Sequence, residues 1–175
     1  MESTPDNSNV DTLNDIGVLK RREIEARIVA PLIERFAEEF GEDRVVELAR
    51  ETVINVARSQ GSVLADAMGG NDLGKFADSM ENWTKGGALE IKVREQSTTT
   101  FAFDVVRCQY AEMYKSLEIP ELGALLSCNR DGTMVEGFNP DIKFERTQTI
   151  MNGAEHCDFR YSLDSTEVDV EIKDT

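Results

Sequence analysis

The sequence predicts an α+β fold in which a helical N-terminal half packs on an antiparallel β-sheet formed by the C-terminal half. Apolar residues recur at helical spacing up to about residue 86, and after it they alternate with polar residues at the spacing of strands. The length of 175 residues, with 40% hydrophobic and 30% charged residues, is typical of one globular domain. We expect a flexible arm over residues 1–12 and a single domain over residues 13–172, helical over 13–86 and mixed sheet and short helices over 87–172.

The helical half is predicted to contain three segments. The first runs from about Leu13 to Gly41, and Pro31 must kink it or begin a second helix because proline lacks a backbone N–H. The second spans residues 42–61 and ends at Gly61, a residue type favoured after helix C-termini, and the third spans residues 72–84. Large apolar residues recur at four-residue steps in the first segment and predict a stripe that faces the core: Ile24, Ile28, Leu32, Phe36 and Phe40.

The C-terminal half is predicted to begin with a β-hairpin over residues 88–96 and 98–107, around a Ser/Thr turn. Two short helices follow over residues 108–117 and 120–129, the second entered through Pro120, and residues 129–140 are rich in turn residues. Residues 141–151 have the pattern of a strand, which returns through an Asn-Gly turn as a partner strand over residues 156–163. The alternating tail over residues 165–175 predicts an edge strand.

The net charge of −15 argues against nucleic-acid and membrane-surface partners, because so acidic a surface repels phosphate backbones and anionic lipids. The sequence has no run of about 18 apolar residues, and its acidic, polar N-terminus is unlike a signal peptide. Three cysteines without a CxxC motif fit free thiols in a reducing compartment. We therefore expect a cytoplasmic protein whose partner is a small molecule, and a homo-oligomer is compatible with the sequence.

Two arginines are predicted on the apolar faces of strands. Arg146 and Gln148 share a face with Phe144 in the strand over residues 141–151, and Arg107 ends the apolar face of a hairpin strand. A buried guanidinium cannot lose its charge, so it needs a carboxylate or a ligand. These positions fit either internal salt bridges or a pocket for a small anion.

The cysteines and the single histidine are candidates for chemistry, although His156 and Cys157 are predicted on opposite faces of one strand. If Cys108 enters the helix that follows it, the helix N-terminus and Arg107 would lower its thiol pKa; the alternative is a small buried hydrophobe. Asp131 is either an acid/base group or a helix-cap and turn residue. We expect no metal and no cofactor, because the spacings match no short zinc motif in the four residues that could form such a site: Cys108, Cys128, His156 and Cys157.

Three stretches resemble the L-2-amino-thiazoline-4-carboxylic acid hydrolase family: DVVRCQYAEMYKSL, ELGALLSCNRDG and GFNPDIKFERTQTIMNGAEHCDFRY. The resemblance is close over residues 100–162 and looser over the helical half, and RTQTIMNGAEHCDFRY is long and specific. It implies a hydrolase-like domain that opens a C–N or C–S bond of a small cyclic amidine or amide. The implied substrate carries a carboxylate, and the implied product is of the carbamoyl-cysteine type.

The resemblance also implies roles for residues of these stretches. Cys108 or Cys157 would be the nucleophile or polariser, or else Asp131 or His156 would activate a water. The substrate carboxylate would bind Arg107 or Arg146. The candidate catalytic residues are Cys108, Cys128, Asp131, His156 and Cys157. The candidate substrate-binding residues are Arg107, Tyr110, Asn139, Arg146, Thr147 and Gln148.

A non-catalytic function is the alternative, in which the same arginines hold an anionic ligand in a sensory or ligand-binding domain and no bond is broken. The strand-turn-strand that ends in a Cys-x-Phe element is also similar, in fold only, to small-ligand-binding domains related to vinyl-reductase and trafficking-complex proteins.

Overall fold

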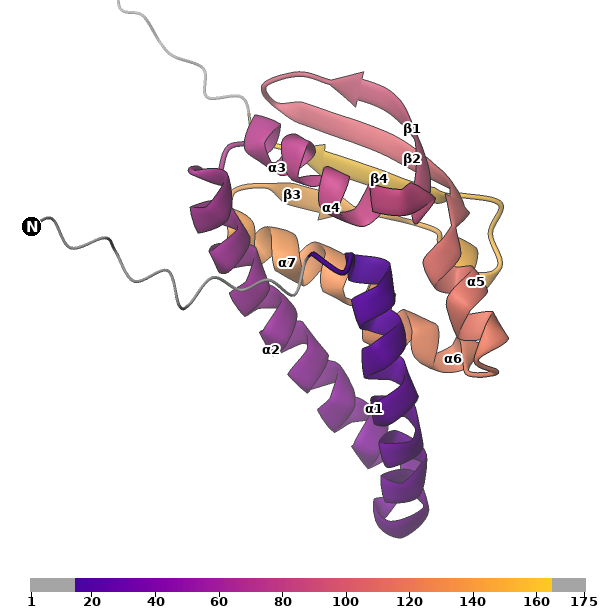
Figure 1. Cartoon of the computed structure of the whole chain (residues 1–175). Coiled ribbons are helices and arrows are strands. Elements are labelled where there is room, and N and C mark those ends of the chain that lie inside the picture. The colour runs from indigo at the N-terminus through magenta and orange to yellow at the C-terminus, as the bar shows by residue number, and fades with distance from the viewer. Residues whose placement is uncertain (1–14, 165–175) are drawn as a thin grey trace, which may run out of the picture.

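Four antiparallel strands form one sheet in the order β1-β2-β4-β3 in the computed structural model, which describes residues 15–164 (Figure 1). The α+β prediction is confirmed, because helices dominate the first half and the described strands all belong to the second. The predicted arm and the predicted edge strand over residues 165–175 lie outside the described residues. The strands are β1 (Leu89–Gln96), β2 (Thr100–Cys108), β3 (Lys143–Glu145) and β4 (Cys157–Ser162).

The long helices α1 and α2 form a hairpin that extends away from the sheet, while α3, α4 and α7 lie close to the strands (Figure 1). None of the helices within residues 15–164 combines the length and the apolar character needed to cross a membrane. The α-helices are α1 (Val18–Phe40), α2 (Glu42–Met68), α3 (Leu73–Ser79), α4 (Glu81–Thr84), α5 (Gln109–Ser116), α6 (Pro120–Gly123) and α7 (Arg130–Phe138). The 3₁₀ turns are η1 (Lys85–Gly87) and η3 (Ile150–Asn152), and η2 (Ala124–Cys128) is a π-helical turn.

The core has two main parts. In the first, β2 and β4 place alternate side chains against α3 and α7, around the fully buried Phe76, Phe103 and Phe138. In the second, α1 and α2 pack on α5, α6 and η2 around Tyr114. The burial alternation along β4 confirms that Cys157 faces the core while its neighbour His156 does not.

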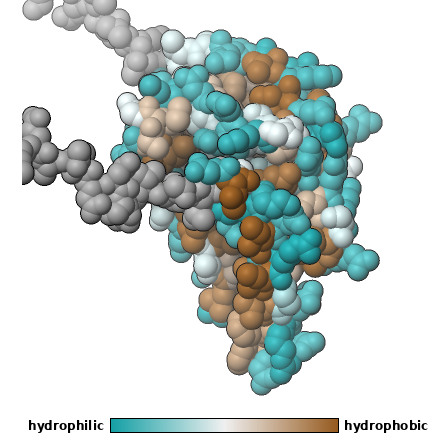
Figure 2. Space-filling model, in the orientation of Figure 1, coloured by the Kyte–Doolittle hydropathy of each residue, from teal (hydrophilic) through white to brown (hydrophobic). Residues whose placement is uncertain are grey.

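The face that α1 buries is not the predicted one. The helix runs unbroken through Pro31 and buries Val18, Arg22, Ala26, Ala30 and Ile33. Two of these residues are alanines, whose small side chains allow close approach of neighbouring helices. The predicted stripe of larger residues is instead between 47% and 67% exposed (Ile24, Ile28, Leu32, Phe36 and Phe40). It contributes to the apolar surface that Figure 2 shows on the part of the molecule formed by the helical hairpin.

Helix α2 continues past Gly61, where the sequence predicted its end, to Met68. Gly61 lies in a close crossing between α2 and α7, in which a Cβ atom would overlap the backbone of α7 at Met134 and Gly137. Gly137 makes the reciprocal contact, since its Cβ would overlap the carbonyl of Arg58. These two glycines therefore act as packing residues at a helix crossing, and neither ends a helix at this point.

Helix α7 replaces the turn-rich segment that was predicted over residues 129–140. The predicted strand over residues 141–151 is also shorter, because β3 ends at Glu145. Beyond it the backbone N–H groups of Thr147 and Gln148 donate to the carboxylate of Asp158 at 3.0 and 2.9 Å. The two-residue alternation stops there, so Gln148 does not share a face with Arg146 as predicted.

A β-bulge in β2 decides which residue at its end faces inward. Glu90 pairs with Arg107 and Ile91 pairs with Val105, so Val106 is an extra residue in β2. A bulge shifts the phase of the in-out alternation by one residue. Arg107 consequently points to solvent, against the prediction, and Cys108 turns inward.

Candidate functional site

A partly open cavity of about 70 Å³ lies where the helical half meets the inner face of the sheet. One water needs roughly 10–15 Å³ on this measure, so the cavity has room for about five to seven waters or for one small molecule of comparable size. Most of the lining is apolar, with a cluster of polar groups. The lining residues used below are Arg22, Cys108, Tyr110, Cys128, Arg130, Asp131, Arg146, Cys157 and Phe159.

Asp131 and Arg146 form an ion pair in the cavity wall, contributed by the first turn of α7 and by the residue after β3. Arg146 also donates to the carbonyl oxygen of Cys128 at 3.2 Å, and its guanidinium carbon lies 5.3 Å from the centre of the Phe159 ring. Burial opposes the charge of Arg146, but the neighbouring carboxylate outweighs burial and raises the pKa of the guanidinium. Burial raises the pKa of Asp131 to about 6 even though Arg146 opposes the shift. Asp131 can therefore gain or lose a proton near neutral pH.

The three cysteines line the cavity from three different elements. Cys108 caps α5, where its sulfur accepts a hydrogen bond from the N–H of Ala111 at 3.4 Å. Burial nevertheless raises the pKa of Cys108 to about 11, so the predicted activation by the helix N-terminus is wrong. Burial also raises the thiol pKa of Cys128 and Cys157. All three are protonated at neutral pH and form a soft, weakly polar wall.

Tyr110, on α5, is a lining residue that carries an unsatisfied polar group. Its side chain is 5% exposed, and its hydroxyl oxygen has no hydrogen-bond partner in the described part of the chain. A buried hydroxyl without a partner is costly and calls for an explanation such as a ligand or an ordered water. Burial raises the pKa of Tyr110, so the group is a neutral donor and acceptor for whatever occupies the cavity.

Two cavity arginines were missed by the sequence analysis. Arg22 is buried on α1, where its Nη1 donates to Glu25 at 2.6 Å. Arg130 donates from Nε to the carbonyl oxygen of Leu126 at 2.8 Å, and burial lowers its pKa to about 10, which leaves it charged at neutral pH. Arg22 lies four residues after Val18, on the narrow apolar face that α1 buries, and this spacing could have identified it as a buried residue. The stripe of larger apolar residues indicated a different face of the helix.

Three cationic side chains and one carboxylate thus contribute to the lining, in a chain of net charge −15. Asp131 pairs with Arg146. Glu25, just outside the lining, pairs with both Arg22 and Arg130. Three cations against these two carboxylates leave a local charge of opposite sign to that of the whole chain. This arrangement favours a small ligand that carries negative charge or a strong acceptor group.

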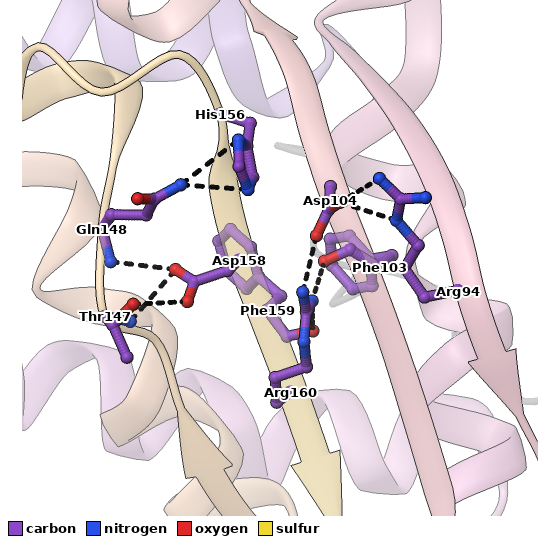
Figure 3. Close-up of polar contacts among 9 residues, drawn as sticks. All are labelled: Arg94, Phe103, Asp104, Thr147, Gln148, His156, Asp158, Phe159 and Arg160. Atoms are coloured by element: carbon purple, nitrogen blue, oxygen red, sulfur yellow. Dashed lines mark hydrogen bonds and ion pairs between the residues drawn. The ribbon is translucent and has the colours of Figure 1, made fainter.

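Three other candidate residues lie on the outer face of the sheet, away from the cavity (Figure 3). The side-chain amide of Gln148 lies 2.9 Å from Nε2 of His156, and the hydroxyl of Thr147 donates to Asp158 at 2.6 Å. Asp104, in the same view, accepts hydrogen bonds from Arg160 at 2.7 Å and from Arg94 at 2.6 Å. The hydrogen bond from Arg160 and the charge of Arg94 lower the pKa of Asp104. These networks tie neighbouring strands and loops together and do not reach the cavity.

Arg107 and Asn139 also lie outside the cavity. Arg107 is exposed and donates to Glu112 at 2.9 Å and to Glu90 at 3.3 Å. Asn139 donates to the carbonyl oxygen of Asn71 at 2.9 Å and holds the loop that follows α7. Of the sequence-predicted residues, the structure brings together Cys108, Tyr110, Cys128, Asp131, Arg146 and Cys157. Within residues 15–164 no group of three or more His, Cys, Asp or Glu side chains has the arrangement needed for a metal ion.

Comparison with known proteins places the chain in a family. The model of the L-2-amino-thiazoline-4-carboxylic acid hydrolase family matches residues 21–161. The chain belongs to this family. The match confirms the resemblance seen over residues 100–162 and extends it across the helical half, so every cavity residue named above lies within the matched region. No curated protein matches this member of the thiazoline-carboxylate hydrolase family.

A solved structure with a similar fold is the phenol-responsive sensory domain of the transcription activator PoxR, determined with phenol. The TM-score is 0.50 at 10% sequence identity, and the match covers 77% of this family member and 72% of the sensory domain. At that identity the likeness concerns the fold alone. The hydrolase family member therefore shares its general architecture with a domain that responds to phenol, a small aromatic molecule.

Proposed function

We propose that the protein is a hydrolase that opens a small cyclic amidine or amide in the cavity, with Asp131 as the acid/base group. The substrate is L-2-amino-thiazoline-4-carboxylate and the product is a carbamoyl-cysteine, in line with the family. The observation that carries it is the half-buried Asp131 carboxyl in the cavity wall, which is ion-paired with the charged Arg146 and whose pKa burial raises to about 6.

Water is the nucleophile in this proposal, because the three cavity thiols are protonated at neutral pH. The Asp131 carboxylate accepts a proton from water as the oxygen bonds to the ring carbon that carries the amino group. The C=N electron pair moves to the ring nitrogen, which takes up a proton from solvent. Collapse of the tetrahedral carbon then breaks the ring C–S or C–N bond as the new hydroxyl releases its proton to solvent and becomes the carbonyl group, and protonated Asp131 returns its proton to the leaving sulfur or nitrogen. One water is consumed and Asp131 ends as it began.

The substrate carboxylate requires a cation, and the cavity supplies three. Arg146 is engaged by Asp131, whereas Arg22 and Arg130 lie on other parts of the lining and share the carboxylate of Glu25, at 2.6 and 3.7 Å. We assign the carboxylate to these arginines and a hydrogen bond of the ring or amino group to the hydroxyl of Tyr110. Such contacts would orient the ring carbon toward the water next to Asp131.

The test is conversion of the thiazoline substrate by wild-type protein and by Asp131→Asn, followed by mass spectrometry of the small molecules. The wild type should form a carbamoyl-cysteine, and the variant should lose at least about 100-fold in rate, the usual contribution of an acid/base group. Asp158→Asn is the matched control, since Asp158 is a hydrogen-bonded aspartate on the outer face of the sheet and should retain the wild-type rate. A wild-type rate in Asp131→Asn would contradict the assigned role.

A second candidate function is the binding of a small ligand without reaction. It is favoured by the mostly apolar cavity, by the unsatisfied hydroxyl of Tyr110 and by the fold shared with a phenol-responsive sensory domain. Calorimetric titration with the thiazoline carboxylate and with phenol, followed by recovery of the small molecule, separates the two functions. Tight binding with the ligand recovered unchanged after long incubation would support the binding function over the hydrolase.

A further inference from the structure

The α1–α2 hairpin carries an apolar surface that no other described element covers. Figure 2 shows apolar atoms along this part of the molecule. A groove of about 570 Å³ runs between the two helices, and its lining includes Leu32, Phe36 and Leu48. Large apolar side chains of the hairpin are between 43% and 67% exposed: Ile24, Ile28, Leu32, Phe36, Phe40, Leu48, Val56 and Val63.

We propose that this hairpin surface is the interface of a homodimer, in which the hairpins of two copies pack against each other about a two-fold axis. The proposal is independent of the chemistry of the cavity. In this dimer the exposed stripe on α1 of one copy lies in the groove between α1 and α2 of the other. The two hairpins together form a four-helix arrangement.

The exposed area is the first argument. At about 150–200 Å² for a fully exposed large side chain, the eight exposed residues leave on the order of 700 Å² in contact with water. This exceeds the ~300–600 Å² of the largest apolar patch on a typical monomer. It approaches the ~800 Å² that each partner contributes to a stable interface of standard size. A second copy of the same hairpin supplies an apolar surface of the same extent.

The distribution of charge is the second argument. Residues 18–68 carry eight basic and ten acidic residues, a net charge of −2, whereas the whole chain has −15. The charges that flank the stripe are already paired within each copy, as in Lys20 with Glu23 at 2.6 Å and Arg35 with Glu38 at 2.8 Å. Two copies repel each other least at this surface, because the remaining residues carry nearly all of the excess negative charge.

The shape of the hairpin is the third argument, because an isologous contact requires a surface that fits itself. The hairpin supplies both a ridge and a groove within one chain. Phe36 and Phe40 lie one turn apart on α1, with ring centroids at 6.2 Å, and both also border the groove. The same rings can therefore enter the partner's groove and cover the partner's rings.

Sedimentation equilibrium of the purified full chain tests the proposal. The wild type should have twice the chain mass of 19.6 kDa. Ile28→Glu and Phe36→Glu should each shift the equilibrium to a single chain, because each places a charge in the apolar contact. Val93→Glu is the matched control, since Val93 is 51% exposed on β1, far from the hairpin, and this variant should keep the dimer mass.

A wild type with the mass of one chain overturns the proposal, and so does a dimer that survives both hairpin substitutions. Hydroxyl-radical footprinting of the unmodified wild type gives a second test that depends on no variant. Oxidation of Phe36 and Phe40 should rise as dilution dissociates the dimer, while oxidation of Phe144, on β3, should stay constant. Labelling of Phe36 and Phe40 that does not change with concentration contradicts the interface.

Discussion

Asp131 and Arg146 are fifteen residues apart in sequence and form an ion pair in the wall of the cavity. Asp131 comes from the first turn of α7 and Arg146 from the point where the chain leaves β3, so the pair joins the helical and sheet layers. Arg146 keeps its charge at any physiological pH, whereas the charge of Asp131 depends on pH. The ionisation of this one carboxyl therefore governs the charge balance of the cavity.

The rate of hydrolysis should rise with pH and be half-maximal near 6. The active form of Asp131 in the proposed reaction is the carboxylate, and burial raises its pKa to about 6, so protonation at lower pH removes the base. Arg146→Met should move this limb to higher pH, because Arg146 is the main group that opposes the raised pKa. The measurement is kcat/KM as a function of pH. A limb that stays in place in Arg146→Met would contradict the assignment.

The cavity thiols should be unreactive in the folded protein. Their pKa values are raised by burial, so the reactive thiolate is scarce at pH 7 to 8. Titration with a chromogenic disulfide should give no rapidly reacting thiol in the native state and three in denaturant. Cys157→Ala should also retain most of the turnover. One thiol that reacts within seconds in the native protein would point instead to a cysteine nucleophile.

Tyr110→Phe should raise stability and weaken ligand binding. The buried hydroxyl has no partner in the described structure, and such a group costs about 1–3 kcal/mol, so its removal should increase the free energy of unfolding of the empty protein. The same change should reduce affinity by about 2–10-fold, through loss of one hydrogen bond. Thermal melting and calorimetric titration measure the two effects. Tyr114→Phe is the control for binding, since Tyr114 does not line this cavity.

Gly137→Ala should destabilise the crossing of α2 and α7. A Cβ atom at this position overlaps the carbonyl of Arg58, and relief requires the helices to separate, at a cost of about 1–3 kcal/mol. Gly74→Ala is the matched control, because Gly74 is exposed in the first turn of α3 and an added Cβ there meets only the end of the Asp72 side chain, at 3.1 Å. Urea unfolding should give Gly137→Ala a clearly lower midpoint than Gly74→Ala. Equal midpoints would contradict the assigned role of Gly137.

Periodicity predicted the class of the fold, the hairpin of β1 and β2 and the inward face of β4, because these depend on local alternation. It selected the wrong face of α1, since that helix has two apolar faces and the smaller residues, such as Ala26 and Ala30, are the ones that pack. Gly137 suggested a turn because the need for a glycine came from a helix distant in sequence. Local pattern contains no information about such a contact.

Six of the eleven candidate residues line the cavity, and they became candidates through their residue types and the family resemblance rather than through periodicity alone. Asp131, Arg146 and the cysteines were named before their spatial arrangement was known, and the structure gathers them around one cavity. Gln148 and Arg107 were misplaced because an aspartate side chain ends one strand and a bulge changes the phase of another. Arg22 and Arg130 come from helices whose packing had to be known first.

The single extra residue at Val106 has a consequence for how this pocket could diverge among relatives. With Val106 in place, β2 presents a thiol to the cavity at Cys108 and a cation to water at Arg107. One residue inserted into β1 between Glu90 and Ile91 would give Val106 a partner, restore regular alternation and exchange the two. The charge lining the pocket can thus be altered by a one-codon insertion in the neighbouring strand that replaces no cavity residue, and a comparison of relatives by amino-acid identity at aligned positions would overlook the change.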